Sequence, residues 1–407
     1  MNFVEGGVCA AQGFRAAGIH VGVKTHATWK KDLALIVSDV DCAAAAVFTK
    51  NVVKAAPILV DKAHLTDGKA RAIVANSGNA NACAPQGEEN AEKMCAAAAA
   101  AIGCKPEDVL VSSTGVIGQT LKVGVIEEGM PALYAALEHS EAASDAAAHA
   151  IMTTDTVKKE AAVETVIGGK TVRLGGIAKG SGMIHPNMGT MLCFLTTDCA
   201  ISPEMIRAAL LETVQVSFNR ISVDGDTSTN DMCVVLANGM AGNPLIEWKD
   251  DGYTVFLKAL RQLCQELARA IAGDGEGASR LITCAVREAR SEESAERLAK
   301  AVVGSPLVKA AMFGADANWG RVLCAMGYSK APFRPEYVDI SFSSAVGAVA
   351  VCRGGMGLDF DEEAARSILS QDEVVIDVHL HEGEHEATCW GCDLTYEYVK
   401  INGDYRT

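Results

Sequence analysis

A single threonine, Thr190, stands at the junction between a loop-like segment and a strand-like segment. The residues before it include Lys179, several glycines, Pro186 and Asn187, which predict irregular backbone. The residues after it, 191–195, form an unbroken apolar run that predicts an interior strand. A hydroxyl group at such a junction can be held rigidly and still meet a ligand, so Thr190 is a candidate nucleophile.

The peptide bond between Gly189 and Thr190 is a candidate for self-cleavage. Attack of the Thr190 hydroxyl on the Gly189 carbonyl would give an ester that water opens, and the freed α-amine could then activate the same hydroxyl. An α-amine titrates near ~7.7–8.0, so part of it is neutral at neutral pH. Gly189 has no Cβ to hinder the attack. The alternative interpretation is that Thr190 is a strand-start hydroxyl that satisfies a nearby backbone group.

Composition limits the classes of protein to which this chain can belong. Its 407 residues, 49% of them hydrophobic, predict a large core divided into two or three subdomains. A net charge of −15 argues against nucleic acid or an anionic membrane as partner. Neither an export signal nor an apolar stretch of membrane-spanning length is present in the sequence, which predicts a soluble, cytoplasmic protein.

Three groups of residues raise the question of a metal site. Cys389 and Cys392 have metal or redox spacing, but no second pair accompanies them, and the other cysteines are scattered as small buried side chains would be. Segment 219–231 is rich in oxygen ligands, yet we interpret it as a hydrogen-bonded turn that braces the candidate nucleophile's strand. His381 and His385 lie in an acidic tract without a defined ligand spacing. The prediction is therefore that the protein uses no metal.

The elements that position these residues alternate between helix and strand. No glycine-rich loop has the spacing of a nucleotide fingerprint, and loops at strand ends are where sites tend to be built. The pattern predicts a layered α/β protein. Alanine-rich amphipathic segments predict helices at 92–102, 130–150 and 255–272. Short apolar runs predict strands at 72–75, 109–112, 191–196, 232–237, 280–286, 337–342 and 374–380.

Several motifs together resemble the ornithine acetyltransferase family, and they occur in order over essentially the whole chain. The resemblance implies an α/β fold with a layered α-β-β-α sandwich. It also implies an acyltransferase of arginine biosynthesis, a glutamate N-acetyltransferase that moves an acetyl group from N2-acetyl-L-ornithine to L-glutamate. The motifs are 113–118, 153–155, 179–198, 219–231, 273–278 and 398–402.

Members of that family cut themselves into two chains before their catalytic threonine. Applied to this sequence, the cut would give an α chain of residues 1–189 and a β chain of residues 190–407, which the family assembles as an α2β2 heterotetramer. The residue before the nucleophile is commonly alanine in the family, whereas here it is Gly189. Glycine permits the attack, but its backbone freedom could slow it. Some members also make N-acetylglutamate from acetyl-CoA, and the sequence leaves this open; no other cofactor is implied.

The resemblance assigns the chemistry to three residues. Thr190 is the nucleophile, which carries the acetyl group between donor and acceptor in a ping-pong reaction. Thr114 and Gly115 match the family's oxyanion-stabilising pair, where a hydroxyl and a backbone N–H face the developing negative charge. Judged from the residues alone, the favoured interpretation of the same motif is an ordinary turn at a strand end.

The resemblance assigns substrate binding to a second group of residues. Lys179 suits the α-carboxylate that ornithine and glutamate share, and it acts with a threonine of the 153–154 pair, where Thr154 is preferred over Thr153. Glu276 lies in a glycine-rich loop and would hold the amino group and help to deprotonate it. Two residues near the C-terminus complete the implied substrate contacts: Asn402 and Thr407.

Two other functions were weighed against acetyl transfer. The first is an amide hydrolase or aminopeptidase of the same self-cleaving architecture, in which water resolves the acyl-enzyme. Lys179 and Glu276 argue instead for two amino-acid substrates. The second is an inert metabolite-binding or scaffold protein, which the presence of Thr190 together with Thr114 and Gly115 disfavours.

Overall fold

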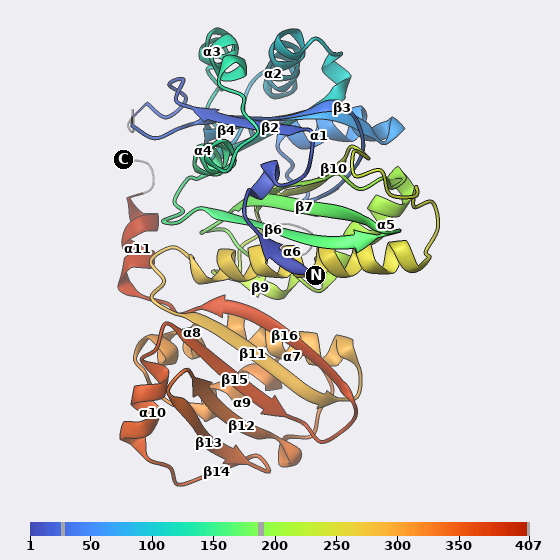
Figure 1. Ribbon diagram of the computed structural model, residues 1–407. Helices are drawn as coiled ribbons and strands as arrows, with labels where there is room; N and C mark the ends of the chain where they lie inside the picture. Colours follow the sequence, from blue (N-terminus) through green and yellow to red (C-terminus); the bar gives the residue numbers. More distant parts are fainter. Residues whose placement is uncertain (26–28, 186–190, 405–407) are drawn as a thin grey trace. The chain divides into compact units, whose positions relative to one another are not determined.

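The computed structural model describes residues 1–25, 29–185 and 191–404 (Figure 1). The chain forms two compact units, in agreement with the size of its core. The predicted division at residue 189 concerns covalent chains and stays a prediction. Unit 1 comprises Met1–Gly180, Pro186–Asn219 and Thr227–Leu267, and unit 2 comprises Ser181–His185, Arg220–Asp226 and Ala268–Thr407.

Unit 1 contains one nine-stranded sheet in the order β1-β6-β7-β8-β10-β3-β4-β5, with β2 paired to β3. The pairs β8–β10 and β4–β5 are parallel, and the other pairs are antiparallel. The strands are β1 Asn2–Val4, β2 Phe14–Ile19, β3 Leu33–Phe48, β4 Lys69–Asn79, β5 Val109–Val116, β6 Lys159–Ile167, β7 Lys170–Lys179, β8 Leu192–Thr197 and β10 Met232–Ala237.

Strand β3 belongs to both halves of this sheet. Its first part pairs with β2 and β4, its last part pairs with β10, and the register with β4 shifts between Val37 and Cys42. Successive side chains of a strand face opposite sides. Accordingly, Ile36 packs with Phe194 of β8 in one buried cluster, whereas Leu35 packs with Met94 of a helix in another. The first cluster lies between the two halves of the sheet.

Helices cover the outer faces of both halves (Figure 1). Helices α2 and α3 supply the outer cluster against β3, β4 and β5. On the other half, Gly176 of β7 leaves room for Leu267 of α6. These layers confirm the predicted α-β-β-α arrangement within unit 1. The helices are α1 Ala56–His64, α2 Gly87–Ile102, α3 Val123–Ala135, α4 Glu141–Ile151, α5 Pro203–Gln215 and α6 Asp251–Gly273.

Unit 2 contains a seven-stranded sheet in the order β14-β13-β12-β15-β11-β16-β9. Its strands bury alternate residues: Val374, Ile376 and Val378 of β15 are buried, and the residues between them are partly exposed. The sheet thus has an apolar face and a polar face. The strands are β9 Ile221–Ser222, β11 Leu281–Ala289, β12 Asp339–Ser344, β13 Gly347–Arg353, β14 Met356–Gly357, β15 Glu373–His379 and β16 His385–Cys392. The helices are α7 Glu292–Gly304, α8 Pro306–Phe313, α9 Trp319–Gly327, α10 Glu362–Leu369 and α11 Tyr396–Gly403.

The predicted strands are all present, as β4, β5, β8, β10, β11, β12 and β15, but one predicted helix is wrong. Residues 130–150 form the end of α3 and all of α4 except its last residue, rather than one helix. The chain leaves the helix because Glu138 forms a bridge with Ala16 of β2. It then begins a new helix at Ser140, whose hydroxyl accepts a hydrogen bond from the N–H of Ala143.

Two further observations bear on the class of protein. The helices in the described ranges include none whose length and apolar character would allow it to cross a membrane. All fourteen cysteines fall within the described ranges and are free there, most of them buried. Cys389 and Cys392 lie in β16 as buried thiols. Burial raises the pKa of Cys389 to about 12, which makes it a poor nucleophile at neutral pH.

Candidate active site

Thr114 and Gly115 lie at the end of β5, where its pairing with β4 becomes irregular. Gly115 has a φ of 130°, and a Cβ at this position would lie 2.4 Å from the carbonyl carbon of Gly78. Only glycine fits such a close approach of two backbones. Thr114 is 9% exposed. The end of β5 therefore has a backbone that a non-glycine residue at 115 would displace.

Asn230 braces this strand end. Its side-chain amide donates to the carbonyl of Ala80 (2.6 Å) and to the carbonyl of Ser113 (2.8 Å). Met232, two residues later, donates its N–H to the carbonyl of Met191 (3.0 Å). The C-terminal part of segment 219–231 is thus bonded both to the neighbour of Thr114 and to the start of the β8 segment, as the interpretation of a bracing turn requires.

Lys179 is the last residue of β7 and pairs directly with Leu192 of β8. Its ammonium nitrogen lies 3.9 Å from Oδ2 of the buried Asp155. Oδ1 of Asp155 accepts from the ammonium of Lys159 (2.6 Å) and from the N–H of Gly180 (2.8 Å). The structure therefore brings Lys179 into the same group as the segment that follows Thr154.

Two members of this group were not predicted as site residues. Asp155 belongs to a motif that the sequence singles out, but its partner Lys159 has no motif of its own. The spacing of four residues would suggest a helical pair, whereas Lys159 begins β6. The chain turns between the two residues and so brings Lys159 to Asp155. The pairing of β6 with β7 shows this, because it places Lys159 opposite Ala178.

In unit 2, two residues that the resemblance assigns to substrate binding, Glu276 and Asn402, lie together. The side-chain amide of Asn402, in α11, donates to Oε2 of Glu276 (2.7 Å). The N–H of Glu276 donates to the carbonyl of Ser181 (3.0 Å). A Cβ on Gly182 would lie 2.4 Å from the Glu276 carboxylate carbon, so this segment needs glycine to pass the buried acid. The C-terminal helix is thus tied to the glycine-rich loop through Glu276.

The segment before the predicted cleavage site is anchored on Asp224. The carboxylate of Asp224 accepts from the N–H groups of Met183 (2.6 Å) and Ile184 (2.9 Å). His185 contacts the hydroxyl of Ser222 through Nδ1 (3.0 Å). Burial and the nearby charge of Lys300 lower the pKa of His185 to about 4, so the imidazole is neutral at neutral pH. The sequence analysis did not single out this histidine, since it has no motif.

Three predicted site residues lie outside the described residues: Gly189, Thr190 and Thr407. The strand that follows Thr190 is described. It begins at Leu192, and all six of its residues are buried, as the apolar run predicts. Thr190 therefore precedes by two residues a central strand that pairs with β7 on one side and with β10 on the other.

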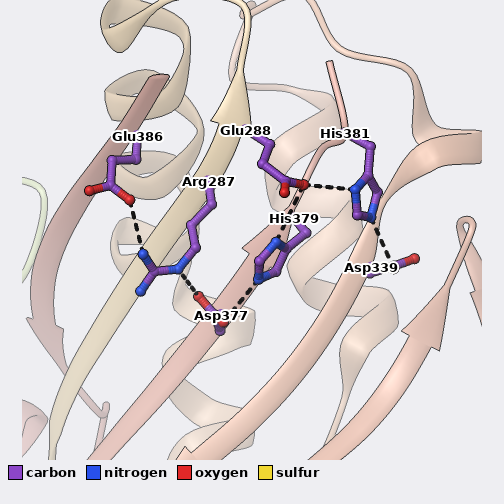
Figure 2. A network of polar contacts seen from close by, with 7 residues as sticks. All are labelled: Arg287, Glu288, Asp339, Asp377, His379, His381 and Glu386. Atoms are coloured by element: carbon purple, nitrogen blue, oxygen red, sulfur yellow. Dashed lines mark hydrogen bonds and ion pairs between the residues drawn. The ribbon is translucent and has the colours of Figure 1, made fainter. Parts of the chain in front are cut away.

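His381 belongs to a polar network on unit 2 (Figure 2). Its Nδ1 lies 2.7 Å from Oε2 of Glu288, and its Nε2 lies 3.1 Å from Oδ2 of Asp339. His379 stacks beside it, with ring centroids 5.9 Å apart. Within the described residues, no group of three or more potential ligands is arranged to hold a metal ion. These histidines contact carboxylates of neighbouring strands.

The layered α/β fold, the glycine-dependent end of β5 and the lysine beside the start of β8 are the features that the acyl-transfer prediction requires. Comparison with known protein families gives a more particular result. The model of the ArgJ family matches residues 15–407. The chain belongs to the ArgJ family, and it is an acyltransferase of arginine biosynthesis.

Relatives with the name "arginine biosynthesis bifunctional protein ArgJ" are similar over their full length. The relative from Symbiobacterium thermophilum is 52% identical over 408 residues and covers 100% of both chains. A relative from Clostridium acetobutylicum is 51% identical, over 97% of this chain and 96% of its own. The predicted family, fold class and enzyme class are confirmed.

Two solved structures are also similar to parts of this chain. The first is arginine biosynthesis bifunctional protein argJ from Bacillus halodurans, with 44% identity and a TM-score of 0.49, covering 52% of this chain and 97% of that chain. The second is ornithine acetyltransferase complexed with ornithine from Mycobacterium tuberculosis, with 40% identity and a TM-score of 0.43, covering 46% of this chain and 98% of that chain.

Proposed function

We propose that this protein transfers an acetyl group from N2-acetyl-L-ornithine to L-glutamate through an acetyl-Thr190 intermediate, after self-cleavage between Gly189 and Thr190. One observation carries the assignment of the site. Lys179, the residue proposed to hold the substrate's α-carboxylate, pairs with Leu192, two residues after Thr190. Donor and acceptor both carry an α-carboxylate next to the nitrogen that reacts, so a cation close to the nucleophile serves both half-reactions.

In the first half-reaction, the hydroxyl of Thr190 attacks the acetyl carbonyl carbon while its own α-amine takes the proton. The hydroxyl of Thr114 and the N–H of Gly115 stabilise the oxyanion. The C–N bond then breaks, and ornithine leaves with the proton. In the second half-reaction, the glutamate amine attacks the ester carbonyl, and the C–O bond to Thr190 breaks as N-acetylglutamate forms.

The remaining assignments belong to the same proposal. Thr154 and Thr407 contact the substrate, and Glu276, held by Asn402, accepts a proton from its amino group. The reaction needs no bound cofactor, and acetyl-CoA is a candidate second acetyl donor. The two chains assemble as an α2β2 heterotetramer in the cytoplasm.

Mass spectrometry of the purified protein tests the proposal. Incubation with N-acetylornithine is expected to give a chain of residues 190–407 that carries one acetyl group, and addition of glutamate is expected to remove it. Thr190→Ala should remain intact and unacetylated. A single uncut chain with full activity would contradict the proposal. Release of free acetate at the same rate without glutamate would instead indicate an amide hydrolase.

A further inference from the structure

A strained turn lies in the described segment that leads to the predicted cleavage site. Met183 has a φ of 59°, in the left-handed region that residues with a Cβ disfavour. The preceding residue, Gly182, passes close to the buried Glu276. Residues other than glycine keep such a backbone only where the surrounding structure imposes it. The contacts around Met183 therefore show what holds this turn in place.

Asp224 supplies the main contacts. Its Oδ2 accepts a hydrogen bond from the N–H of Met183 (2.6 Å), and its Oδ1 accepts one from the N–H of Ile184 (2.9 Å). Two successive N–H groups in a turn form a concave site that favours an anion. The carbonyl of Ile184 adds a third bond, which it accepts from the N–H of Val223 (2.7 Å). Asp224 thus holds the turn through both of its carboxylate oxygens.

The carboxylate of Asp224 is itself held by the C-terminal helix. The hydroxyl of Tyr398, in α11, donates to Oδ2 of Asp224 (3.3 Å). Burial and the nearby charge of Asp224 raise the pKa of Tyr398, so its hydroxyl keeps its proton at neutral pH. In the same helix, the amide of Asn402 donates to Glu276 (2.7 Å). One helix therefore contacts both the acid that holds the turn and the acid of the glycine-rich loop.

The start of α11 is docked closely on that loop. The hydroxyl of Thr395 donates to the carbonyl of Gly277 (2.6 Å), and it accepts from the N–H of Glu397 (3.2 Å), which caps the helix. A Cβ on Gly277 would lie 2.7 Å from the backbone nitrogen of Tyr398. The helix can reach this position only after the last residues of the chain have been made and have folded.

We propose that Asp224 and Tyr398 are positioning residues for self-cleavage, and that the C-terminal helix must dock before the chain is cut. The turn at Met183 sets the direction in which the chain leaves toward the bond between Gly189 and Thr190. Direction matters for an intramolecular attack, because a misplacement of about 1 Å can lower a rate about 10²-fold. The inference rests on the proposed function and deepens it.

The covalent step is an acyl shift from nitrogen to oxygen, followed by hydrolysis. The hydroxyl oxygen of Thr190 attacks the carbonyl carbon of Gly189, the C–N bond breaks, and the freed amine takes up the hydroxyl proton. One water molecule then opens the ester, which gives a carboxyl group on Gly189 and restores the hydroxyl of Thr190. Asp224 and Tyr398 exchange no proton in this sequence. They act by holding the backbone that leads to the reacting bond.

The rate of self-cleavage tests the inference. Full-length chains are made by cell-free synthesis, stopped in denaturant at successive times, and separated into the intact chain and its two products. Asp224→Asn replaces one acceptor oxygen by a donor that faces an N–H group, and should slow cleavage about tenfold or more. Tyr398→Phe removes one hydrogen bond and should slow cleavage about three- to tenfold.

Glycine at position 183 separates positioning from general stability. Glycine adopts a positive φ readily, so the turn can form without the carboxylate. The double variant Asp224→Asn, Met183→Gly should therefore regain most of the cleavage rate. Tyr396→Phe is the matched control on the same helix. Tyr396 is 83% exposed, and the variant keeps the ring that packs against Phe313, so it should be cut at the wild-type rate.

Failure of the inference and failure of the proposed function give different results. Wild-type cleavage rates in Asp224→Asn and Tyr398→Phe, or no recovery in the double variant, would overturn the inference and leave acetyl transfer intact. If circular dichroism shows that Asp224→Asn does not fold, Tyr398→Phe carries the test, because it keeps the packing of the ring. A wild-type chain that never cuts itself would overturn the proposed function, and the inference with it.

Discussion

Each unit contains a cluster of acidic and basic side chains, and the two clusters differ in burial. In unit 1, Asp155 and Lys159 are shielded from solvent. In unit 2, the side chains of the network in Figure 2 are 26% to 66% exposed. Exposed ion pairs contribute about 0–1 kcal/mol, whereas removing one partner of a buried pair costs about 3–5 kcal/mol. Similar contact distances therefore have very different consequences in the two units.

The local backbone also differs between the clusters. In unit 2, Glu288 and His381 have positive φ values of 57° and 54°, and the register of β11 against β16 shifts between Val286 and Ala289. This irregularity turns Glu288 toward His381. In unit 1, regular antiparallel pairing of β6 with β7 brings Lys159 to the end of β7. The buried cluster depends on the sheet itself, and the exposed one lies on an irregular part of the sheet.

The largest difference is expected in activity. Lys179→Met removes the proposed carboxylate ligand and should lower kcat/KM for acetyl transfer by about 10²–10³, since loss of one partner of a buried charge pair costs about 2–5 kcal/mol. His381→Ala should leave kcat/KM unchanged. Steady-state assays with N-acetylornithine and glutamate measure both. Comparable losses of kcat/KM in the two variants would show that the buried cluster is no more important for acetyl transfer than the exposed one.

The second difference concerns stability. Asp155→Asn removes the carboxylate that two buried lysines share and should lower the free energy of unfolding by about 3–5 kcal/mol at pH 7. Asp377→Asn removes an acid that contacts Arg287 and His379 on the surface, and should cost less than about 1 kcal/mol. Urea unfolding of both variants against wild type gives the values. Equal losses of unfolding free energy in the two variants would contradict the expected difference between the buried and the exposed cluster.

At low pH, the loss of unfolding free energy caused by Asp155→Asn should disappear. The pKa of Asp155 is lower in the folded protein than its unfolded value near ~3.9, so its stabilisation is fully present above that value. It is lost as the pH falls further, through the folded pKa. The stability difference between wild type and Asp155→Asn should therefore be constant from pH 5 to pH 7 and shrink below about pH 4. A cost that persists unchanged at pH 2 would mean that charge is not its source.

Asp231 offers a contrast within unit 1. It is buried like Asp155, but burial dominates and raises its pKa. Its contribution to stability is therefore greatest below the unfolded pKa and falls as the pH rises through the folded value. Asp231→Asn, which cannot ionise, should be more stable than wild type at pH 8, by about 1.4 kcal/mol for each unit by which folding raises the pKa of Asp231. The advantage should vanish near pH 3, as thermal melts across pH would show.

The smallest expected effect is that of salt. Arg287 contacts Asp377 and Glu386 at 2.9 Å on an exposed face, and 1 M NaCl screens such pairs over about 3 Å. The small cost of Arg287→Ala should disappear at 1 M NaCl, whereas that of Asp155→Asn should remain. Denaturant titrations at low and high salt compare them. A buried cluster as sensitive to salt as the surface one would show that water reaches Asp155.

The sequence predicted those parts of the fold that depend on local pattern. Short apolar runs located β5 and β8, and the motif at Thr114 proved to lie at a strand end. Glu276 and Asn402, which the resemblance assigns to substrate binding, contact each other, and their role stays a prediction. The sequence missed the break before Ser140, because the alanine-rich pattern continues through it and a distant bridge decides it.

The local sequence pattern also does not predict the buried group of Lys159, Lys179 and Asp155. Lys159 and Lys179 meet at Asp155 because β6 and β7 pair in one particular register, with Lys159 opposite Ala178. Nothing in the residues near Lys159 indicates that register. The missed strand β3 has a related cause, since polar residues at 38, 39 and 41 interrupt its apolar pattern where its register with β4 shifts.

The strand order of unit 1 has a consequence for the proposed self-cleavage. In the sheet, β8 and β10 lie between β7 on one side and β3 on the other. Strands from before position 189 therefore lie on both sides of strands from after it: β8 and β10 separate β1, β6 and β7 from β2, β3, β4 and β5 in the strand order. A chain of residues 1–189 made alone would expose two unpaired strand edges and would be prone to aggregate. If the chain is cleaved at the proposed site between Gly189 and Thr190, folding must precede the cut, and the two resulting chains are interleaved too closely to exchange.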